Sequence, residues 1–410
     1  EQENLPLFKS STWEEAFDII TPFLKKGEIY VVFDEVPWMA NDNPNLIAII
    51  KYYWDNKWKF NKDLTLILCG SIAQFMVNHV LHSEALHNRK TFEMKVKPLP
   101  CYEAARFFKP KTSEYEKALF LMTLGGIPKY LEQMNSRKSF FHNLREEFFK
   151  ENGFFVKEFD TIFKEQFKVT KVYEKIVREL ATSPKSLVDL GGALKMEGGG
   201  FNEYLQNLVH ADFITRYMAF DLSGKKKEKT IKYELNDEFL KFYLNILEPH
   251  INLIEAKMGE GLVESLHRKF EAYYGKTFEL FCIKNIKTLI KILGIKESEI
   301  INFGPYFHQR TRSKLISKMK KETIKGKIHE GMQIDLMIVL KKKRIIVCEC
   351  KFTEIPIGVS VIDEVEGKIK KLAAKTGFSI SPILLSAKGA TKELHLKEYF
   401  DQIVDLTSFF

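Results

Sequence analysis

The chain has 410 residues, of which 45% are hydrophobic and 29% charged, a balance typical of folded domains rather than of disordered proteins. No apolar run is long enough to span a bilayer and no signal-peptide pattern opens the chain, so we expect no membrane partner. The five scattered cysteines favour a reduced, cytoplasmic location, and the net charge of +9 favours an anionic partner, nucleic acid and above all DNA.

The length predicts about two to four domains, and changes of pattern along the chain place their boundaries. The expected fold class is α/β, because strands alternate with helices near both ends. The predicted segments are a partial parallel core (1–110), a helical lid-like region (111–165), three helices with a hairpin (166–236), a helical connector (237–262) and a second α/β domain (263–410).

The first segment places polar residues after two apolar strands. Asp34 and Glu35 follow strand 28–33, and Ser71 follows strand 64–69. Strands separated by a helix pair in parallel, and such sheets bind ligands at the carboxyl ends of their strands. Asp34 would hold Mg²⁺ and Glu35 would polarise an attacking water. The alternative is that these are ordinary acidic residues where a strand meets a loop.

The segment 166–236 has the pattern of a winged helix-turn-helix. Lys225, Lys226 and Lys227 fall at the expected tip of the wing, where they would contact phosphates. The helix before the hairpin has no Lys or Arg, which favours a packing or regulatory role over groove reading. The expected helices are 171–181, 186–195 and 201–210, with a glycine break at 198–200, and the expected strands are 213–220 and 230–235.

The last segment carries a hairpin with three charged residues on one face. Strand side chains alternate between faces, so Asp335 lies across from Glu349, and Lys351 projects beside them. Two carboxylates can bind Mg²⁺, and a lysine can stabilise developing charge, as phosphodiester hydrolysis requires. The alternative is an ordinary solvated strand pair. The expected elements are a long helix, 263–290, and strands 333–340, 344–350 and 382–386.

A basic segment precedes the strand that bears Asp335. Arg310, Arg312 and Lys314 belong to it. Beside a metal site, this segment would hold a phosphate backbone without reading sequence. A solvated loop is the alternative.

Four stretches in the first 132 residues resemble one family. "YVVFDEVPWM", "LILCGSIAQFM", "LHNRKTFEMKVKPLPCYEA" and "GGIPKYLE" occur in this order and resemble the archaeal-type ATPases, which are AAA-like P-loop proteins. The resemblance implies that Asp34 and Glu35 are the Walker B pair and that Ser71 is the sensor. It further implies that Arg89 is a phosphate-sensing or intersubunit finger, in ATP binding by a homo-oligomer.

The sequence departs from this family at the phosphate-binding loop. No G-x-x-x-x-G-K-[ST] stands before Asp34, although backbone amides and a lysine of that motif cradle the phosphates. Residues 274–277 imitate its end, but the required first glycine would be Phe270. We therefore expect this chain alone to bind ATP weakly or not at all.

The C-terminal hairpin resembles the PD-(D/E)XK restriction-endonuclease-like superfamily, which also implies Mg²⁺. Glu279 matches the glutamate that this superfamily often adds on its first helix. Archaeal-type ATPases frequently end in such a tail. Three functions follow: an ATPase coupled to a DNA-associated nuclease-like tail, an Mg²⁺-dependent DNA endonuclease with the N-terminal region as scaffold, or a catalytically degenerate interaction module.

Overall fold

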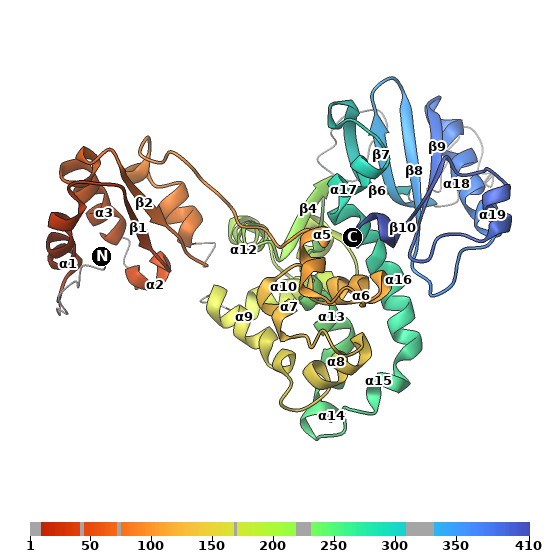
Figure 1. Ribbon diagram of the computed structural model, residues 1–410, viewed down its shortest axis with the longest axis horizontal. Coiled ribbons are helices and arrows are strands. Elements are labelled where there is room, and N and C mark those ends of the chain that lie inside the picture. The colour runs from red at the N-terminus through yellow and green to blue at the C-terminus, as the bar shows by residue number, and fades with distance from the viewer. Residues whose placement is uncertain (1–9, 42–44, 72–74, 168–169, 219–230, 309–331) are drawn as a thin grey trace, which may run out of the picture. The chain divides into compact units, whose positions relative to one another are not determined.

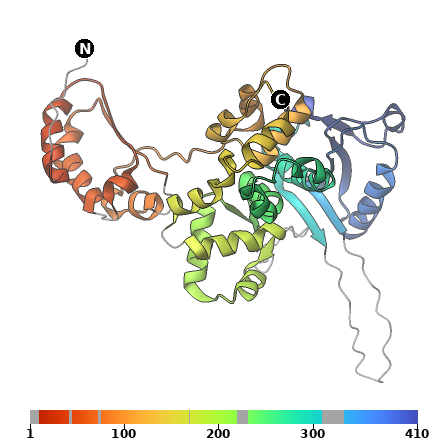
Figure 2. The same cartoon turned by 90° about the horizontal axis from the view of Figure 1, so that it is seen from below.

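A computed structural model describes residues 10–41, 45–71, 75–167, 170–218, 231–308 and 332–410. The protein is mixed α/β, with 55% helix and 17% strand, which confirms the predicted class. Among the described helices, none combines the length and the apolar character that crossing a bilayer demands. The chain forms two compact units, drawn in Figures 1 and 2: Glu1–Val96, Asp160–Lys175 and Met196–Ile214 make the first, and Lys97–Phe159, Ile176–Lys195 and Thr215–Phe410 the second.

The first unit contains a parallel strand pair, as predicted. Thr12 caps its first helix by accepting a hydrogen bond from the backbone N–H of Glu15. The two strands pair in parallel with Phe33 opposite Leu68, so their carboxyl ends lie at one edge. The elements are α1 (Trp13–Ile20), β1 (Ile29–Phe33), α2 (Val36–Ala40), α3 (Asn45–Asn56) and β2 (Leu64–Leu68).

An aromatic cluster holds these elements together. The ring of Phe17 lies 5.3 Å from the rings of Phe33 and Tyr53 and 5.2 Å from that of Trp58. The indole of Trp58 donates a hydrogen bond to Thr21, as a buried Trp N–H requires. Because Phe33 ends β1, this cluster fixes the position of the acidic residues that follow the strand.

The two strands are buried on one face only, although their sequences are almost continuously apolar. The side chains of Phe33 and Leu64 are buried with those of α1 and α3. On the opposite face, Tyr30 is 64% exposed, Val32 54% and Ile67 41%. The described helices of this unit therefore cover one face of β1 and β2.

The second unit has a helical part with an aromatic core. Gly125 ends α6 with φ +66°, and Pro128 begins α7. Phe148 and Phe155 stack with their ring centroids 4.4 Å apart. The helices before the large sheet are α5 (Cys101–Ala104), α6 (Glu114–Leu124), α7 (Pro128–Gln133), α8 (Phe140–Phe148), α13 (Glu238–Phe242) and α14 (Ile251–Glu255).

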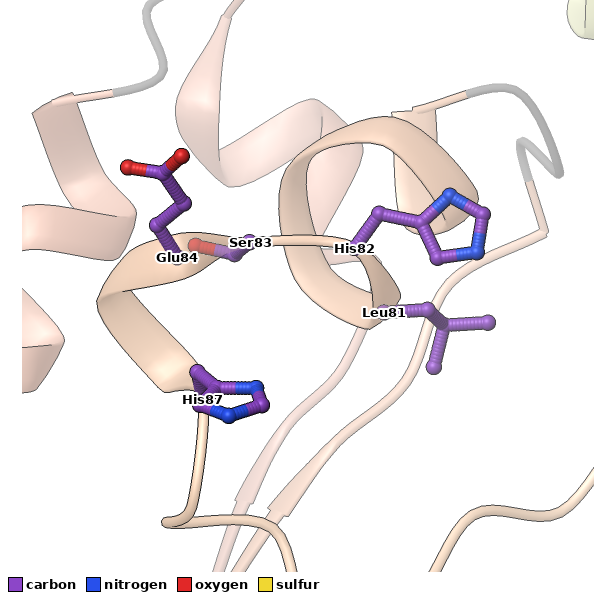
Figure 3. Close-up of a pocket in the computed structure, with 5 residues that line it drawn as sticks. All are labelled: Leu81, His82, Ser83, Glu84 and His87. Carbon is purple, nitrogen blue, oxygen red and sulfur yellow. The ribbon is translucent and has the colours of Figure 1, made fainter.

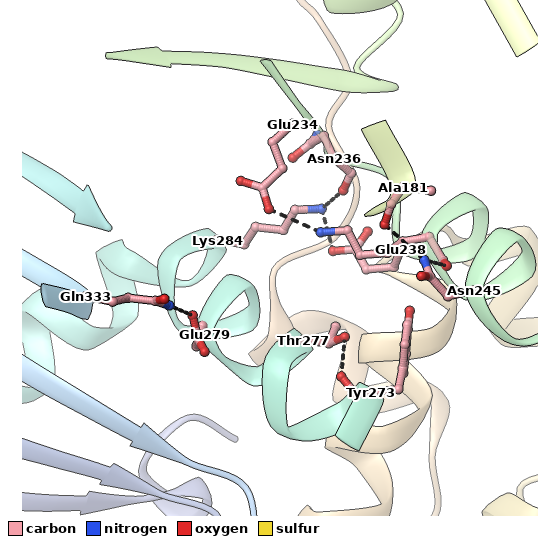
Figure 4. A network of polar contacts seen from close by, with 11 residues as sticks. Ala181, Glu234, Asn236, Glu238, Asn245, Tyr273, Thr277, Glu279, Lys284 and Gln333 are labelled. Atoms are coloured by element: carbon pink, nitrogen blue, oxygen red, sulfur yellow. Dashed lines mark hydrogen bonds and ion pairs between the residues drawn. The ribbon is translucent and has the colours of Figure 1, made fainter. Parts of the chain in front are cut away.

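The single helix predicted over 263–290 is wrong, because three helices occupy this stretch and its continuation: α15 (Leu262–Ser265), α16 (His267–Lys284) and α17 (Ile286–Ile292). The second break falls at Asn285, whose side chain accepts a hydrogen bond from the backbone N–H of Cys101. At the end of α16, Lys284 pairs with Glu238 of α13 at 2.5 Å (Figure 4). Tertiary contacts of this kind, which periodicity does not reveal, determine the helix ends.

The segment predicted as a winged helix has the expected order of elements. The glycine break predicted at 198–200 is wrong, because the third helix begins at Gly198, whose φ is +84°; the gap between α11 and α12 is residues 195–197. The short sheet has the strand order β3–β5–β4, and the division into two units passes through this segment. The elements are α9 (Glu158–Gln166), α10 (Thr170–Thr182), β3 (Lys185–Ser186), α11 (Leu187–Leu194), α12 (Gly198–His210), β4 (Ile214–Met218) and β5 (Ile231–Leu235).

A five-stranded sheet dominates the end of the second unit (Figure 1). Its order is β10–β9–β8–β7–β6; the pairs among β6, β7 and β8 are antiparallel, and those among β8, β9 and β10 are parallel. Three of these strands match predicted ones, whereas β6 and β10 were not predicted. The elements are β6 (Ile300–His308), β7 (Met332–Leu340), β8 (Arg344–Lys351), α18 (Val361–Thr376), β9 (Ser379–Ser386), α19 (Lys392–Leu396) and β10 (Gln402–Asp405).

The central strands of this sheet are buried on both faces. In β8, every residue from Ile345 to Cys350 is buried, because α16 contacts β7 and β8 while α18 contacts β7 and β9. A solvated polar face, the alternative considered for this hairpin, is therefore absent from β8. Any charged side chain on these strands must find its partners inside the protein.

The aromatic cluster generates a stability prediction for the first unit. Replacing Phe17 by Ala should lower its free energy of unfolding by about 3–5 kcal/mol, because a buried ring is lost and a cavity remains. All four tryptophans lie between residues 13 and 58, so tryptophan fluorescence during urea unfolding reports on this unit. Phe92→Ala is the matched control, because Phe92 is 78% exposed. Equal destabilisation by both substitutions would contradict this assignment of the core.

Candidate functional site

The hairpin of β7 and β8 brings two predicted carboxylates together inside the sheet. Asp335 is 7% exposed and Glu349 is 1% exposed. Leu336 pairs with Cys348 across the two strands, and the backbone N–H of Cys350 donates a hydrogen bond of 2.9 Å to Asp335. The strand register thus aims both carboxyl groups at one interior position.

Two lysines contact the buried Glu349 from different elements. Lys351, two residues further along β8, approaches it at 2.9 Å. Lys368 of α18 approaches its other carboxylate oxygen at 2.6 Å. Both lysines also contact Glu364, at 2.9 Å from Lys351 and 3.2 Å from Lys368. The predicted trio of Asp335, Glu349 and Lys351 is therefore assembled, together with two charged residues from α18.

Burial makes this position electrostatically demanding. It raises the pKa of Asp335, against the opposing effects of the Cys350 backbone N–H and of the two lysines. It also raises the pKa of Glu349, and the charge of Asp335 adds to that rise. The neighbouring lysines and the backbone N–H therefore do not fully offset the loss of hydration of these two carboxylates. A cation would relieve the repulsion between them.

Glu279 belongs to the same electrostatic cluster. It lies on α16 and accepts a long hydrogen bond of 3.5 Å from Gln333 of β7 (Figure 4). Burial raises its pKa to about 7, and the charges of Asp335 and Glu349 contribute to the rise. The position predicted for a helix-borne glutamate is thus occupied by a carboxyl group that interacts with both strand carboxylates.

Sequence reasoning missed Lys368 and Glu364. Both lie on α18, for which no helix was predicted. They are four residues apart, a spacing that places side chains on one face of a helix, and they form an i,i+4 ion pair. That spacing was readable in the sequence, but it also occurs on ordinary solvated helices. Its meaning depends on the packing of α18 against the sheet.

The donor set suits a hard cation that keeps part of its own water shell. Within the described ranges, no three acidic, His or Cys side chains converge closely enough to hold a metal by themselves. Mg²⁺ typically uses one or two protein carboxylates and takes its remaining ligands from water or phosphate. Asp335 and Glu349 fit that mode, provided that a cation displaces a lysine from Glu349.

The first unit brings Glu35 and Ser71 together, as predicted. The Ser71 hydroxyl donates a hydrogen bond of 2.9 Å to Glu35, and its backbone N–H donates another of 3.2 Å to the same oxygen. Asp34 accepts hydrogen bonds from Cys69 and from the Glu35 backbone N–H. The acidic pair and the serine therefore share the carboxyl edge of β1 and β2.

Backbone conformation and close packing position the residues at the carboxyl ends of β1 and β2. Glu35 has φ 51°, a left-handed conformation uncommon for a residue other than glycine, and it directly precedes α2. A Cβ atom at Gly70 would lie 2.4 Å from a side-chain carbon of Pro37, so only glycine allows β2 to end this close to α2. The Gly-Ser sequence thus combines close packing with a polar side chain.

Arg89 makes its side-chain ion pair away from the carboxyl edge of β1 and β2. Its guanidinium forms a bidentate interaction with Asp55 of α3, with N–O distances of 2.9 and 2.8 Å. An ion pair of this kind is the structural alternative to the predicted finger role. The finger role stays a prediction.

A shallow hollow of about 570 Å³ lies elsewhere in the first unit. Figure 3 shows its lining, with the rings of His82 and His87 held apart from each other. Of the predicted site residues that the structure describes, none lines it. The lining residues are Leu81, His82, Ser83, Glu84 and His87.

The predicted nucleic-acid contacts cannot be located. Lys225, Lys226 and Lys227, together with Arg310, Arg312 and Lys314, lie outside the described residues. Their roles remain predictions from sequence.

Comparisons with known proteins found a matching family and a similar protein. Residues 243–368 match a family described as "Archaea bacterial proteins of unknown function". The chain is also similar to an uncharacterized protein of Methanocaldococcus jannaschii, with 27% identity over 310 residues, which are 76% of this chain and 67% of that protein. The range matched by the family begins at Tyr243, directly after α13, ends at Lys368 and includes the whole charged cluster.

The raised pKa of Glu279 predicts a pH-dependent stability. The carboxyl group ionises near 4.5 in the unfolded chain and near 7 in the folded protein. Between these pH values the folded protein retains a proton that the unfolded chain has lost, so stability falls as pH rises through this window. Glu279→Gln should remove this part of the fall, measured by urea unfolding with circular dichroism. Glu271→Gln, an exposed position of the same helix, should leave it unchanged; identical pH profiles for all three proteins would contradict the burial of Glu279.

Proposed function

We propose that the second unit carries an Mg²⁺-dependent nuclease that acts on DNA. The observation that supports it most directly is the convergence of Asp335 and Glu349, both buried, with Lys351 at 2.9 Å from Glu349. A buried pair of carboxylates has no stabilising role that apolar residues would not fill better. Metal-assisted hydrolysis of phosphodiesters is a chemistry that requires such a pair.

Asp335 and Glu349 would hold the metal; Glu279, which was predicted as a further ligand, lies in the same electrostatic cluster. Bound Mg²⁺ supplies an activated water and stabilises the leaving oxygen. The hydrogen bond from Cys350 to Asp335 orients that carboxylate.

Lys351 would stabilise negative charge on the phosphate. It extends from the same strand as Glu349 and is 29% exposed, so its ammonium group is accessible from solvent. Neighbouring carboxylates outweigh the effect of burial and raise its pKa. It therefore stays a cation and acts by charge rather than by proton transfer.

The proposal that the substrate is DNA rests on charge and on the order of elements. The chain carries a net charge of +9, and basic proteins bind nucleic acid through its phosphates. The order α10, β3, α11, α12, β4, β5 with the sheet order β3–β5–β4 supports a winged helix in this segment. In this proposal the winged helix positions the DNA and the nuclease-like sheet cleaves it.

A second candidate function concerns the first unit, which we propose as half of an ATP site. The supporting observation is the pair of hydrogen bonds from Ser71 to Glu35 at the carboxyl edge of β1 and β2. Asp34 would hold the Mg²⁺ of Mg·ATP, while Glu35 would orient the attacking water and Ser71 would respond to the terminal phosphate. ATP hydrolysis, with Arg89 contributing in a homo-oligomer, would regulate the DNA-directed units.

The nuclease proposal predicts a loss of plasmid nicking in single variants. Asp335→Asn and Glu349→Gln should each reduce Mg²⁺-dependent nicking by about 100-fold or more, because each removes a charged ligand. The readout is conversion of supercoiled plasmid to the nicked form, with EDTA as the metal-free control. Glu366→Gln is the matched control, because Glu366 pairs with Lys370 on the surface of α18.

Nicking that persists in Asp335→Asn and Glu349→Gln would contradict the nuclease proposal. No nicking by the unchanged protein, together with no Mg²⁺ binding, would favour the remaining alternative of a degenerate interaction module.

The ATP half-site predicts a fluorescence response. Trp38 is 63% exposed and stands three residues after Glu35, so Mg·ATP bound at this edge should change its emission. Asp34→Asn should weaken the apparent affinity for Mg·ATP by about tenfold through loss of a metal ligand. Asp63→Asn, an exposed change in the same unit, serves as the control. A response that is equal in all three proteins would contradict the role of Asp34.

A further inference from the structure

Four charged side chains at the candidate nuclease site form a closed ring. Each carboxylate contacts both lysines, and each lysine contacts both carboxylates, so the charges alternate around it. The four N–O distances lie between 2.6 and 3.2 Å. The ring consists of Glu349, Lys351, Glu364 and Lys368. With two positive and two negative charges, the ring neutralises itself.

The ring has an inner and an outer side. The Glu349 side chain is 1% exposed and marks the inner side. Lys368 and Lys351 are 17% and 29% exposed, and Glu364 is 48% exposed. An anion that approaches the lysines from solvent would therefore meet them on the side where the carboxylate of Glu364 now lies.

The carboxylate of Glu364 can be displaced from the two lysines by another anion. Burial disfavours its charge, but the hydrogen bond and charge of Lys351 and the charge of Lys368 outweigh burial and hold its pKa at about 2. It therefore stays an anion at neutral pH. Its long side chain is half exposed, so moving it into water requires no rearrangement of the sheet. By contrast, the side chain of Glu349 is buried on β8, so it cannot move away from the lysines without opening the packing between the sheet and its helices.

We propose that Glu364 occupies the place of a substrate phosphate on Lys351 and Lys368 and competes with phosphate for them. The inference deepens the proposed nuclease function by assigning Lys368 to phosphate binding and Glu364 to the control of access. A phosphate carries oxygen atoms that can contact both ammonium groups at once, as the two oxygens of Glu364 do. In the metal-free protein, binding then exchanges one anion for another while the buried Glu349 keeps both of its lysines.

The test uses the full chain, inorganic phosphate and neither Mg²⁺ nor DNA. Glu364→Gln keeps the shape of the side chain and removes its charge, so it should bind phosphate about three- to tenfold more tightly than the unchanged protein, a range set by a partly exposed ion pair. Affinity is read from calorimetric titration at constant ionic strength. Glu366→Gln, on the same helix and paired with Lys370, should bind phosphate as the unchanged protein does.

A second substitution distinguishes competition from a general effect of charge. Adding Lys368→Gln to Glu364→Gln should abolish the gain, because one of the two phosphate contacts is then missing. Phosphate affinity in Glu364→Gln that equals or falls below that of the unchanged protein would overturn the proposal, as would a gain that survives the loss of Lys368. Melting temperatures of all variants show whether each is folded.

This inference and the nuclease proposal fail separately. Tighter phosphate binding by Glu364→Gln without plasmid nicking would support the phosphate site and remove the nuclease. Nicking that depends on Asp335 with unchanged phosphate affinity in Glu364→Gln would support the nuclease and remove the role of Glu364.

Discussion

The carboxylate of Glu349 lies at the centre of a sheet that helices cover on both faces, and its charge must be compensated there. An ionised carboxylate loses its hydration when it is buried, and several kcal/mol per ion are at stake even after relaxation. The ammonium groups of Lys351 and Lys368 supply the compensation at 2.9 and 2.6 Å. Loss of either would leave a buried charge with half of its partners.

Several features of the second unit follow from this constraint. The β7–β8 hairpin sets Asp335 beside Glu349, and a backbone N–H of β8 binds Asp335. Helix α18 crosses the sheet so that Lys368 reaches the interior, and α16 brings Glu279 to the same cluster. Apolar residues of α18 also pack on this sheet, but that packing does not require charged side chains in the interior. Function, rather than stability, accounts best for charges that are so costly to bury.

Sequence alone predicts the part of this site that lies on strands. Because side chains alternate along a strand, Asp335, Glu349 and Lys351 could be assigned to one face before any coordinates were known. The burial of that face could not be predicted, because it depends on the packing of α18 against the sheet. Lys368 and Glu364 were missed for the same reason. Local spacing indicates which residues share a helix face, but not what the face packs against.

The rest of the fold shows the same division between local and tertiary information. The strand pair of the first unit was predicted from its apolar runs, whereas the exposure of Tyr30 and Val32 was not. The helix predicted over 263–290 is interrupted at Asn285 by a bond to Cys101, which lies 184 residues away in the chain. Strand β6 was missed because Gly304 and Pro305 interrupt its pattern.

Direct detection of a bound cation tests the central claim, that the buried carboxylates form a metal site. Mn²⁺, which replaces Mg²⁺ at oxygen-rich sites and is visible by electron paramagnetic resonance, can be titrated into the full chain. We expect an Mn²⁺ site that Mg²⁺ displaces and that is lost in both Asp335→Asn and Glu349→Gln. Mn²⁺ binding that is absent, or that persists unchanged in both variants, would contradict it and leave the charged ring as a structural feature of the sheet.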